Sequence, residues 1–141
     1  MNKSGPILIV EDDKDDREIL SEVFKKLGYR NKVKYFSDGN EALNFLIEYD
    51  EVPFIIMSDI NMPKLNGMEL RDIIQKNEEL RMKCVPFIFF TTSTTKKSVT
   101  DAYAFSVQGF FIKPNSFKEL EQIIRKVMEY WIDCKSPSDY I

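Results

Sequence analysis

The chain contains no histidine and only two cysteines. Without histidine it has no Ser–His triad, no His-ligated zinc site and no phosphohistidine of its own. Cys84 and Cys134 lack metal-ligand spacing and are predicted to stay reduced in a cytoplasm. No apolar stretch approaches the roughly 20 residues that a membrane helix needs. The N-terminus also lacks the apolar core of a signal peptide.

The composition is that of a soluble globular protein with a slight acidic excess. Of the 141 residues, 43% are hydrophobic and 30% are charged, and the net charge is −3. The excess of acid argues against nucleic acid as the main ligand. No linker or repeat divides the chain, so we expect one domain over residues 1–141, with a core at about 7–132 and a frayed polar tail at 133–141.

Apolar runs alternate with segments of helical periodicity along the core. Five strands are expected, at Ile7–Glu11, Lys32–Phe36, Phe54–Ser58, Val85–Phe90 and Phe110–Ile112. Five helices are expected, at Lys14–Leu27, Asn40–Tyr49, Asn66–Lys76, Lys96–Phe105 and from Ser116 onward. This alternation predicts an α/β fold of the flavodoxin-like kind, with a doubly wound parallel sheet of strand order 2-1-3-4-5.

Acidic residues stand at the ends of two predicted strands. Glu11 and Asp12 follow the first strand, and Asp59 follows the third. In the predicted order these strands are neighbours where the winding reverses, which is where such sheets bind ligands. Carboxylates this close repel one another, and a hard cation such as Mg²⁺ removes the conflict. The competing interpretation, helix capping, is preferred for Asp13 and Asp15.

Two other polar residues follow predicted strands. Lys113 precedes Pro114, so its backbone is held extended and its ammonium can balance a carboxylate or hold a phosphoryl oxygen. Thr91 is the first hydroxyl after the fourth apolar run and is suited to hydrogen-bond an incoming phosphoryl group. The plainer interpretations are a solvated lysine and, for residues 92–95, an ordinary loop. Phe110 on its own reads as a core residue.

Taken together, these residues resemble the receiver domain of two-component response regulators. The match extends from residue 7 to about residue 132, and residues 91–93 and 113–116 are similar to single-domain regulators of the phytochrome-associated type. The residues that carry it follow the family's order and spacing: Glu11, Asp12, Asp59, Met62, Pro63, Gly67, Thr91, Lys113 and Pro114.

The resemblance implies a magnesium site and no other cofactor. Asp12 and Asp59 would bind Mg²⁺ directly, Asn61 would contribute its backbone carbonyl, and Glu11 would act through water. Some family members carry aspartate where Glu11 stands, and the exchange is a frequent one.

The resemblance also implies a switch. Asp59 would accept a phosphoryl group from a phosphohistidine on a histidine kinase or phosphotransfer protein, with Thr91 and Lys113 on the phosphoryl oxygens. Thr91 would move inward and Phe110 would follow, changing the surface of the fourth helix, fifth strand and fifth helix for an unknown downstream protein. The same surface is a candidate for homodimer contacts. The chain would be a cytoplasmic phosphoacceptor that catalyses only its own phosphorylation and dephosphorylation, without a DNA-binding domain.

Three features depart from the family pattern. Phe110 stands where many members carry tyrosine, and Asn115 stands where phenylalanine is common. The stretch Lys76–Cys84 is longer and more charged than is typical, and the sequence assigns it no role.

Three other functions remain open at this point. An aspartyl phosphatase would need a second acid two residues after Asp59, where Asn61 stands. A flavodoxin-like electron carrier would need a hydroxyl- and glycine-rich phosphate loop where Glu11 and Asp12 stand. A receiver-like module that is never phosphorylated would not need the complete residue set.

Overall fold

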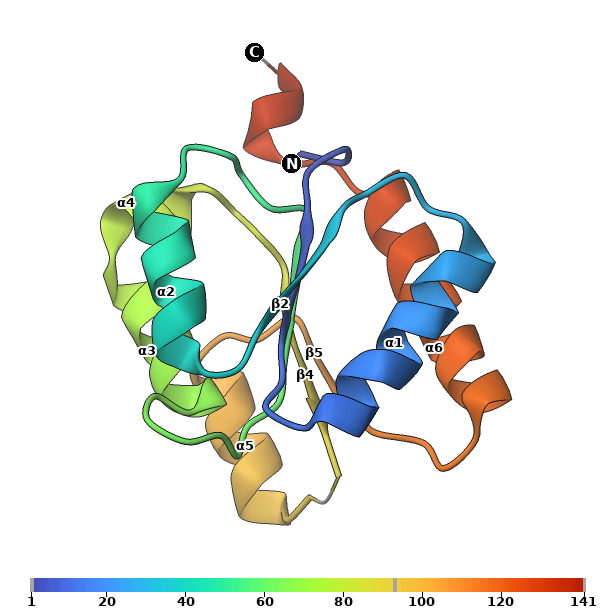
Figure 1. The fold of residues 1–141 in the computed structure, drawn as a ribbon. Helices are drawn as coiled ribbons and strands as arrows, with labels where there is room; N and C mark the ends of the chain where they lie inside the picture. The colour runs from blue at the N-terminus through green and yellow to red at the C-terminus, as the bar shows by residue number, and fades with distance from the viewer. Residues whose placement is uncertain (1, 93, 141) are drawn as a thin grey trace.

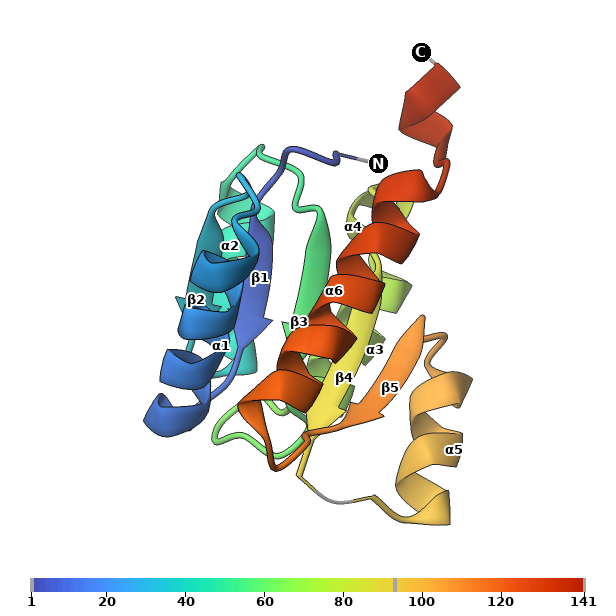
Figure 2. The same cartoon turned by 90° about the vertical axis from the view of Figure 1, so that its right-hand side faces the viewer.

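The computed structural model describes residues 2–92 and 94–140, which form a five-stranded parallel sheet between two layers of helices (Figures 1 and 2). The strand order is β2-β1-β3-β4-β5, as predicted. The strands are β1 Ile7–Val10, β2 Val33–Phe36, β3 Ile55–Ser58, β4 Phe87–Thr91 and β5 Gly109–Ile112. The helices are α1 Lys14–Leu27, α2 Gly39–Glu48, α3 Gly67–Lys76, α4 Glu78–Met82, α5 Lys96–Ala104 and α6 Phe117–Asp133.

Alternate residues of each strand face two separate cores. Ile7 and Ile9 of β1 pack with α1 and α6 on one side of the sheet, while Leu8 and Val10 pack with α2 and α3 on the other. Figure 1 shows these two helix layers on either side of the sheet, which is seen nearly edge-on. Because β1, β3 and β4 are buried on both faces, they read in the sequence as continuous apolar runs.

Helix boundaries agree with the predictions to within about two residues, because capping residues mark them. Asp13 caps α1 by accepting a hydrogen bond from the Asp16 amide at 3.1 Å, and Gly28 ends this helix with φ at 73°. Asn66 and Glu69 form a reciprocal capping box at the start of α3.

The prediction of five helices was wrong, since the described residues form six α-helices. The additional helix, α4, lies in the Lys76–Cys84 stretch, which was given no role. Asn77 caps it by accepting from the Leu80 amide at 3.0 Å, and Leu80 is buried beneath it. One buried apolar residue in a five-residue helix is too little for a recognisable period. The predicted fourth and fifth helices are therefore α5 and α6.

The described part of the C-terminal tail contains one further element. A short 3₁₀ helix, η1 at Pro137–Tyr140, interrupts the tail that was predicted to be frayed, and Asp139 accepts a hydrogen bond from the Ser136 amide at 2.7 Å.

Among the described residues, no helix combines the length and the apolar character that crossing a bilayer would require. Cys84 and Cys134 are free cysteines in this structure, the first exposed and the second half-buried.

Candidate functional site

The predicted acidic residues meet at the carboxyl ends of β1 and β3. Glu11 continues from β1 and Asp59 continues from β3, and the Asp59 amide donates to the Val10 carbonyl at 2.9 Å. Parallel pairing of β1 with β3 therefore brings residues 48 positions apart in the chain to adjacent places. The N-terminal turn of α1 lies at the same end of the sheet, as Figure 2 shows.

Three carboxylates form a compact donor set there. One oxygen from each of Glu11, Asp12 and Asp59 lies within 4.8 Å of the others. Glu11 is 2% exposed and Asp59 is 9% exposed, whereas Asp12 is open to solvent. An all-oxygen set with one open side suits a hard divalent cation that keeps some of its water.

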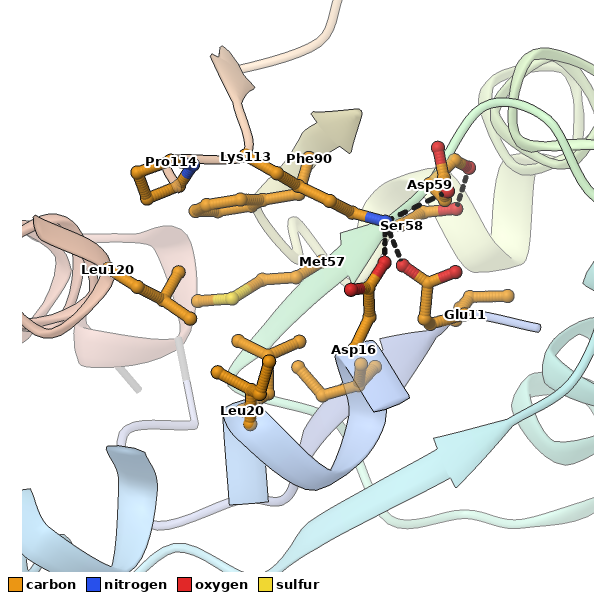
Figure 3. A pocket seen from close by; sticks show the side chains of 13 residues that line it. Glu11, Asp16, Leu20, Met57, Ser58, Asp59, Phe90, Lys113, Pro114 and Leu120 are labelled. Atoms are coloured by element: carbon orange, nitrogen blue, oxygen red, sulfur yellow. Dashed lines mark hydrogen bonds and ion pairs between the residues drawn. The ribbon is translucent and has the colours of Figure 1, made fainter. Parts of the chain in front are cut away.

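Lys113 joins the cluster from the end of β5. Its ammonium donates to Asp16 at 2.7 Å, to Asp59 at 3.1 Å and to Glu11 (Figure 3). The side chain is only 14% exposed, so these contacts are shielded from water. A small cavity of about 60 Å³ lies beside them, with an apolar wall that includes Leu20. Four acids and one ammonium leave the site negative, so the residues present fit a cation such as Mg²⁺.

Burial and the neighbouring charges of opposite sign shift the pKa in opposing directions, both for Glu11 and for Lys113. Burial raises the pKa of Glu11 to about 7, although Lys113 partly offsets this effect. Burial alone would lower the pKa of Lys113, but hydrogen bonds to Asp16 and Glu11 and the charges of Glu11 and Asp59 outweigh it, so this pKa is raised. Lys113 is therefore a permanent cation, whereas Glu11 changes protonation near neutrality.

The Asp59 carboxylate is held by the chain around it. The Ile60 amide donates to Asp59 Oδ1 at 2.7 Å, which leaves Oδ2 to Lys113. The start of α3 packs against the segment after Asp59, where the Gly67 amide donates to the Ile60 carbonyl at 2.9 Å. A Cβ at Gly67 would collide with the Asp59 carbonyl oxygen and would lie 2.9 Å from the Phe89 ring. Glycine is therefore required here for close approach.

Thr91 is the last residue of β4 and is 1% exposed. Its carbonyl accepts from the Lys113 amide at 2.7 Å, which ties the two strand ends together. In the described part of the chain, Thr91 Oγ1 is the only buried side-chain nitrogen or oxygen without a hydrogen-bond partner. Leaving such a group unpaired costs roughly 1–3 kcal/mol, so this hydroxyl is a candidate to bind something the folded chain does not supply.

The other predicted residues lie around this centre. Asn61 is exposed in the loop after β3. Phe110 lies opposite Phe89 in the β4–β5 pairing, and their rings meet edge to face with centroids 6.1 Å apart. Asn115 is exposed in the turn before α6. The second predicted cap, Asp15, lies in the first turn of α1 but does not cap it.

Asp16 is a site residue that the sequence analysis missed. It lies in the first turn of α1, three residues after the N-cap Asp13, which holds it at the same end of the sheet as the strand-end acids. The run of acids from Asp12 to Asp16 concealed it, because helix capping explains such a run equally well.

Comparison with known proteins identifies this arrangement. Residues 7–125 match the family model of the response regulator receiver domain. The chain is 30% identical to response regulator Rcp1 of a Synechocystis strain, covering 94% of this chain and 92% of Rcp1. It is 31% identical to a probable methanogenesis regulatory protein, FilR2, of Methanothrix harundinacea, covering 89% and 83%.

Solved structures of response regulators have the same fold as this chain. The phosphorylated cyanobacterial phytochrome response regulator RcpA superposes with a TM-score of 0.83 at 25% identity, covering 93% of this chain and 96% of RcpA. The Mn²⁺-bound form of Rcp1 superposes with a TM-score of 0.79 at 29% identity, covering 92% and 96%. The family model, the relatives and the shared fold lead to one conclusion: this chain belongs to the receiver-domain family of two-component response regulators and is a phosphorylation switch of a phosphorelay.

Proposed function

We propose that Asp59 is the residue that accepts the phosphoryl group. The P–N bond of a partner's phosphohistidine breaks, the histidine nitrogen keeps the bonding pair, and an Asp59 carboxylate oxygen bonds to phosphorus. The donor lies on a histidine kinase or phosphotransfer protein, because this chain has no histidine. An aspartyl phosphatase has less support, since the Asn61 amide cannot serve as the general acid.

The observation that carries the proposal is the convergence of buried charge at one end of the sheet. Asp59 Oδ1 is held by a backbone amide and Oδ2 by Lys113, beside the carboxylate of Glu11. Two carboxylates with a cation between them are costly to bury for stability alone, so a chemical role accounts for them better than a structural one.

Glu11, Asp12, Asp59 and the backbone carbonyl of Asn61 are the residues we propose for holding Mg²⁺. The donor set supports this choice, since oxygens from three of them already lie within 4.8 Å. When bound, the ion would neutralise charge on the oxygens of the phosphoryl group being transferred.

Thr91 and Lys113 are proposed to bind the phosphoryl oxygens. Lys113 is permanently charged beside Asp59, and the unpaired Thr91 hydroxyl has a hydrogen bond to donate. A hydroxyl drawn toward the new phosphate would shift the end of β4, and Phe110 would follow through its contact with Phe89. Phosphorylation then acts by favouring one of two arrangements of the α5–β5–α6 surface.

The remaining features of the proposal concern assembly and setting. The chain would act as one domain that catalyses only its own phosphorylation and dephosphorylation. Its α5–β5–α6 surface would bind an unknown downstream protein or a second copy of the chain. A cytoplasmic location is consistent with the two free thiols.

Intact-mass measurement after incubation with acetyl phosphate and magnesium tests the proposal. Wild type and Asp15→Asn, a matched exposed acid on α1, should each gain one phosphoryl group, and Asp59→Asn should gain none. Chelation of magnesium should abolish labelling of wild type. A phosphoryl group on Asp59→Asn, or full labelling without magnesium, would overturn the assignment.

A further inference from the structure

A second cavity lies at the opposite end of the sheet from Asp59. It has a volume of about 290 Å³ and is lined by residues of α3 and α4, by the segments that precede β4 and β5, and by Trp131 near the end of α6. Figures 1 and 2 show α4 near the chain termini, at the amino ends of the strands, whereas the acidic site lies at their carboxyl ends. The proposed phosphoryl transfer uses none of the residues that line this cavity.

Arg71 is a buried cation in the wall of this cavity. It is 5% exposed, and burial lowers the pKa of its guanidinium. Nε donates to the Phe105 carbonyl at 3.0 Å, and Nη2 donates to the Ser106 carbonyl at 2.7 Å and to Gln75 Oε1 at 3.1 Å. All three acceptors are neutral, and in the described part of the chain no hydrogen bond from Nη1 is seen. A guanidinium has five N–H donors, so the N–H groups of Nη1 remain able to donate hydrogen bonds to a ligand.

Two more cations line the same cavity. Arg81 donates to the Gln75 carbonyl and Lys83 to the Leu46 carbonyl, each at 3.3 Å. Within residues 2–92 and 94–140, no carboxylate forms an ion pair with Arg71, Arg81 or Lys83. The described lining contains no aspartate or glutamate. Arg71 also lies over the Phe87 ring, with Cζ 5.4 Å from the ring centroid. Three cations without a carboxylate partner among the described residues therefore share one cavity in a protein whose net charge is −3.

The rest of the cavity wall is largely apolar. Leu80, Val85 and Pro86 contribute to it, together with the indole of Trp131. A volume of this size is close to the lower limit of small-molecule sites, which combine an apolar wall with a few convergent polar groups. A cationic end and an apolar wall complement a compact organic anion, and planar guanidinium groups bind carboxylate or phosphate oxygens in pairs.

We propose that this cavity is a binding site for a small organic anion, one that carries a carboxylate or phosphate group on an apolar body of about the size of one aromatic ring. Arg71 would hold the anionic group from the inside, Arg81 and Lys83 would hold it from the rim, and the apolar body would lie toward Trp131.

The single tryptophan of the chain reports on the site. Trp131 fluorescence should change saturably with benzoate or with phenylphosphonate, whose P–C bond cannot donate a phosphoryl group. Neutral benzamide should bind at least about tenfold more weakly, because a charge-assisted hydrogen bond is worth more than about 1.4 kcal/mol. Stronger binding of one anion identifies the preferred head group. No saturable change with either anion, or equal binding of benzamide, would overturn the proposal.

Variants at Arg81, which is exposed, and at Lys83, which is half-buried, test the cations without changing the buried Arg71. Arg81→Gln and Lys83→Gln should each weaken binding of the better anion about fivefold. Lys76→Gln removes a neighbouring exposed lysine that is paired with Asp72 at 3.0 Å, so binding should not change. Equal affinities for all three variants would refute the site. Asp59→Asn should bind the anion like wild type, so failure of the phosphoacceptor proposal would be seen separately.

Discussion

Replacement of Thr91 by valine should stabilise the metal-free protein while impairing its phosphorylation. Thr91 is 1% exposed, and its Oγ1 has no hydrogen-bond partner among the described residues. Valine keeps the shape and the β-branch that suit a strand, but it removes the buried hydroxyl. Relief of the unpaired group should raise the free energy of unfolding by about 1–2 kcal/mol, within the usual cost of such a group. For a domain of this size this corresponds to a rise in Tm of about 3–8 °C.

Urea denaturation with a chelator present measures this change, and acetyl phosphate labelling of the same variant measures the loss of function. Thr92→Val is the matched control, because Thr92 is the exposed neighbour and its replacement should change stability by less than about 0.5 kcal/mol. Two results would contradict this role of the Thr91 hydroxyl in binding the phosphoryl oxygens. One is a loss of 1 kcal/mol or more in the unfolding free energy of metal-free Thr91→Val, and the other is labelling of this variant as fast as wild type.

Three further predictions follow from the same site. Gly67→Ala should destabilise the protein by about 1–3 kcal/mol in urea, because its Cβ would collide with the Asp59 carbonyl; an unchanged midpoint would contradict this. Lys113→Met should lower the free energy of unfolding of the metal-free protein by about 3 kcal/mol, because buried carboxylates lose their cation. Magnesium should then stabilise this variant more than it stabilises wild type, and equal stabilisation of the two would argue against a shared site. Because Glu11 has a pKa of about 7, it is protonated at lower pH and magnesium must displace that proton. The Mg²⁺ affinity measured by calorimetry should therefore rise by at most about tenfold per pH unit up to pH 7 and then level off, and a flat profile from pH 5 to 8 would be the contrary result.

The sequence was sufficient for the sheet and for most of the acidic site. β1, β3 and β4 are buried on both faces, so their apolar runs are unambiguous, and the winding rule then places Glu11 beside Asp59. No side-chain distance was needed for that step, because neighbouring parallel strands end at the same edge of the sheet.

The features that the sequence did not predict have one physical cause, because each depends on tertiary contacts. α4 buries little more than Leu80, and its Asn77 cap and acidic first turn are too few local signals to mark a helix of five residues. Asp16 belongs to the site because Lys113 reaches it from a strand 97 residues away. The unpaired state of Thr91 Oγ1 likewise depends on what surrounds the end of β4 in space. Capping and periodicity describe neighbours along the chain, so they do not reveal which side chains meet from distant strands.

The position of the phosphoryl group on the chain can be determined chemically, which decides whether Asp59 is the acceptor. Borohydride reduction of the acetyl phosphate-treated protein converts an acyl phosphate to an alcohol, and peptide mass spectrometry then identifies the modified residue. We expect the reduced side chain at position 59 and at no other carboxylate. Reduction at Asp12 or Asp16 with an unmodified Asp59 would contradict it.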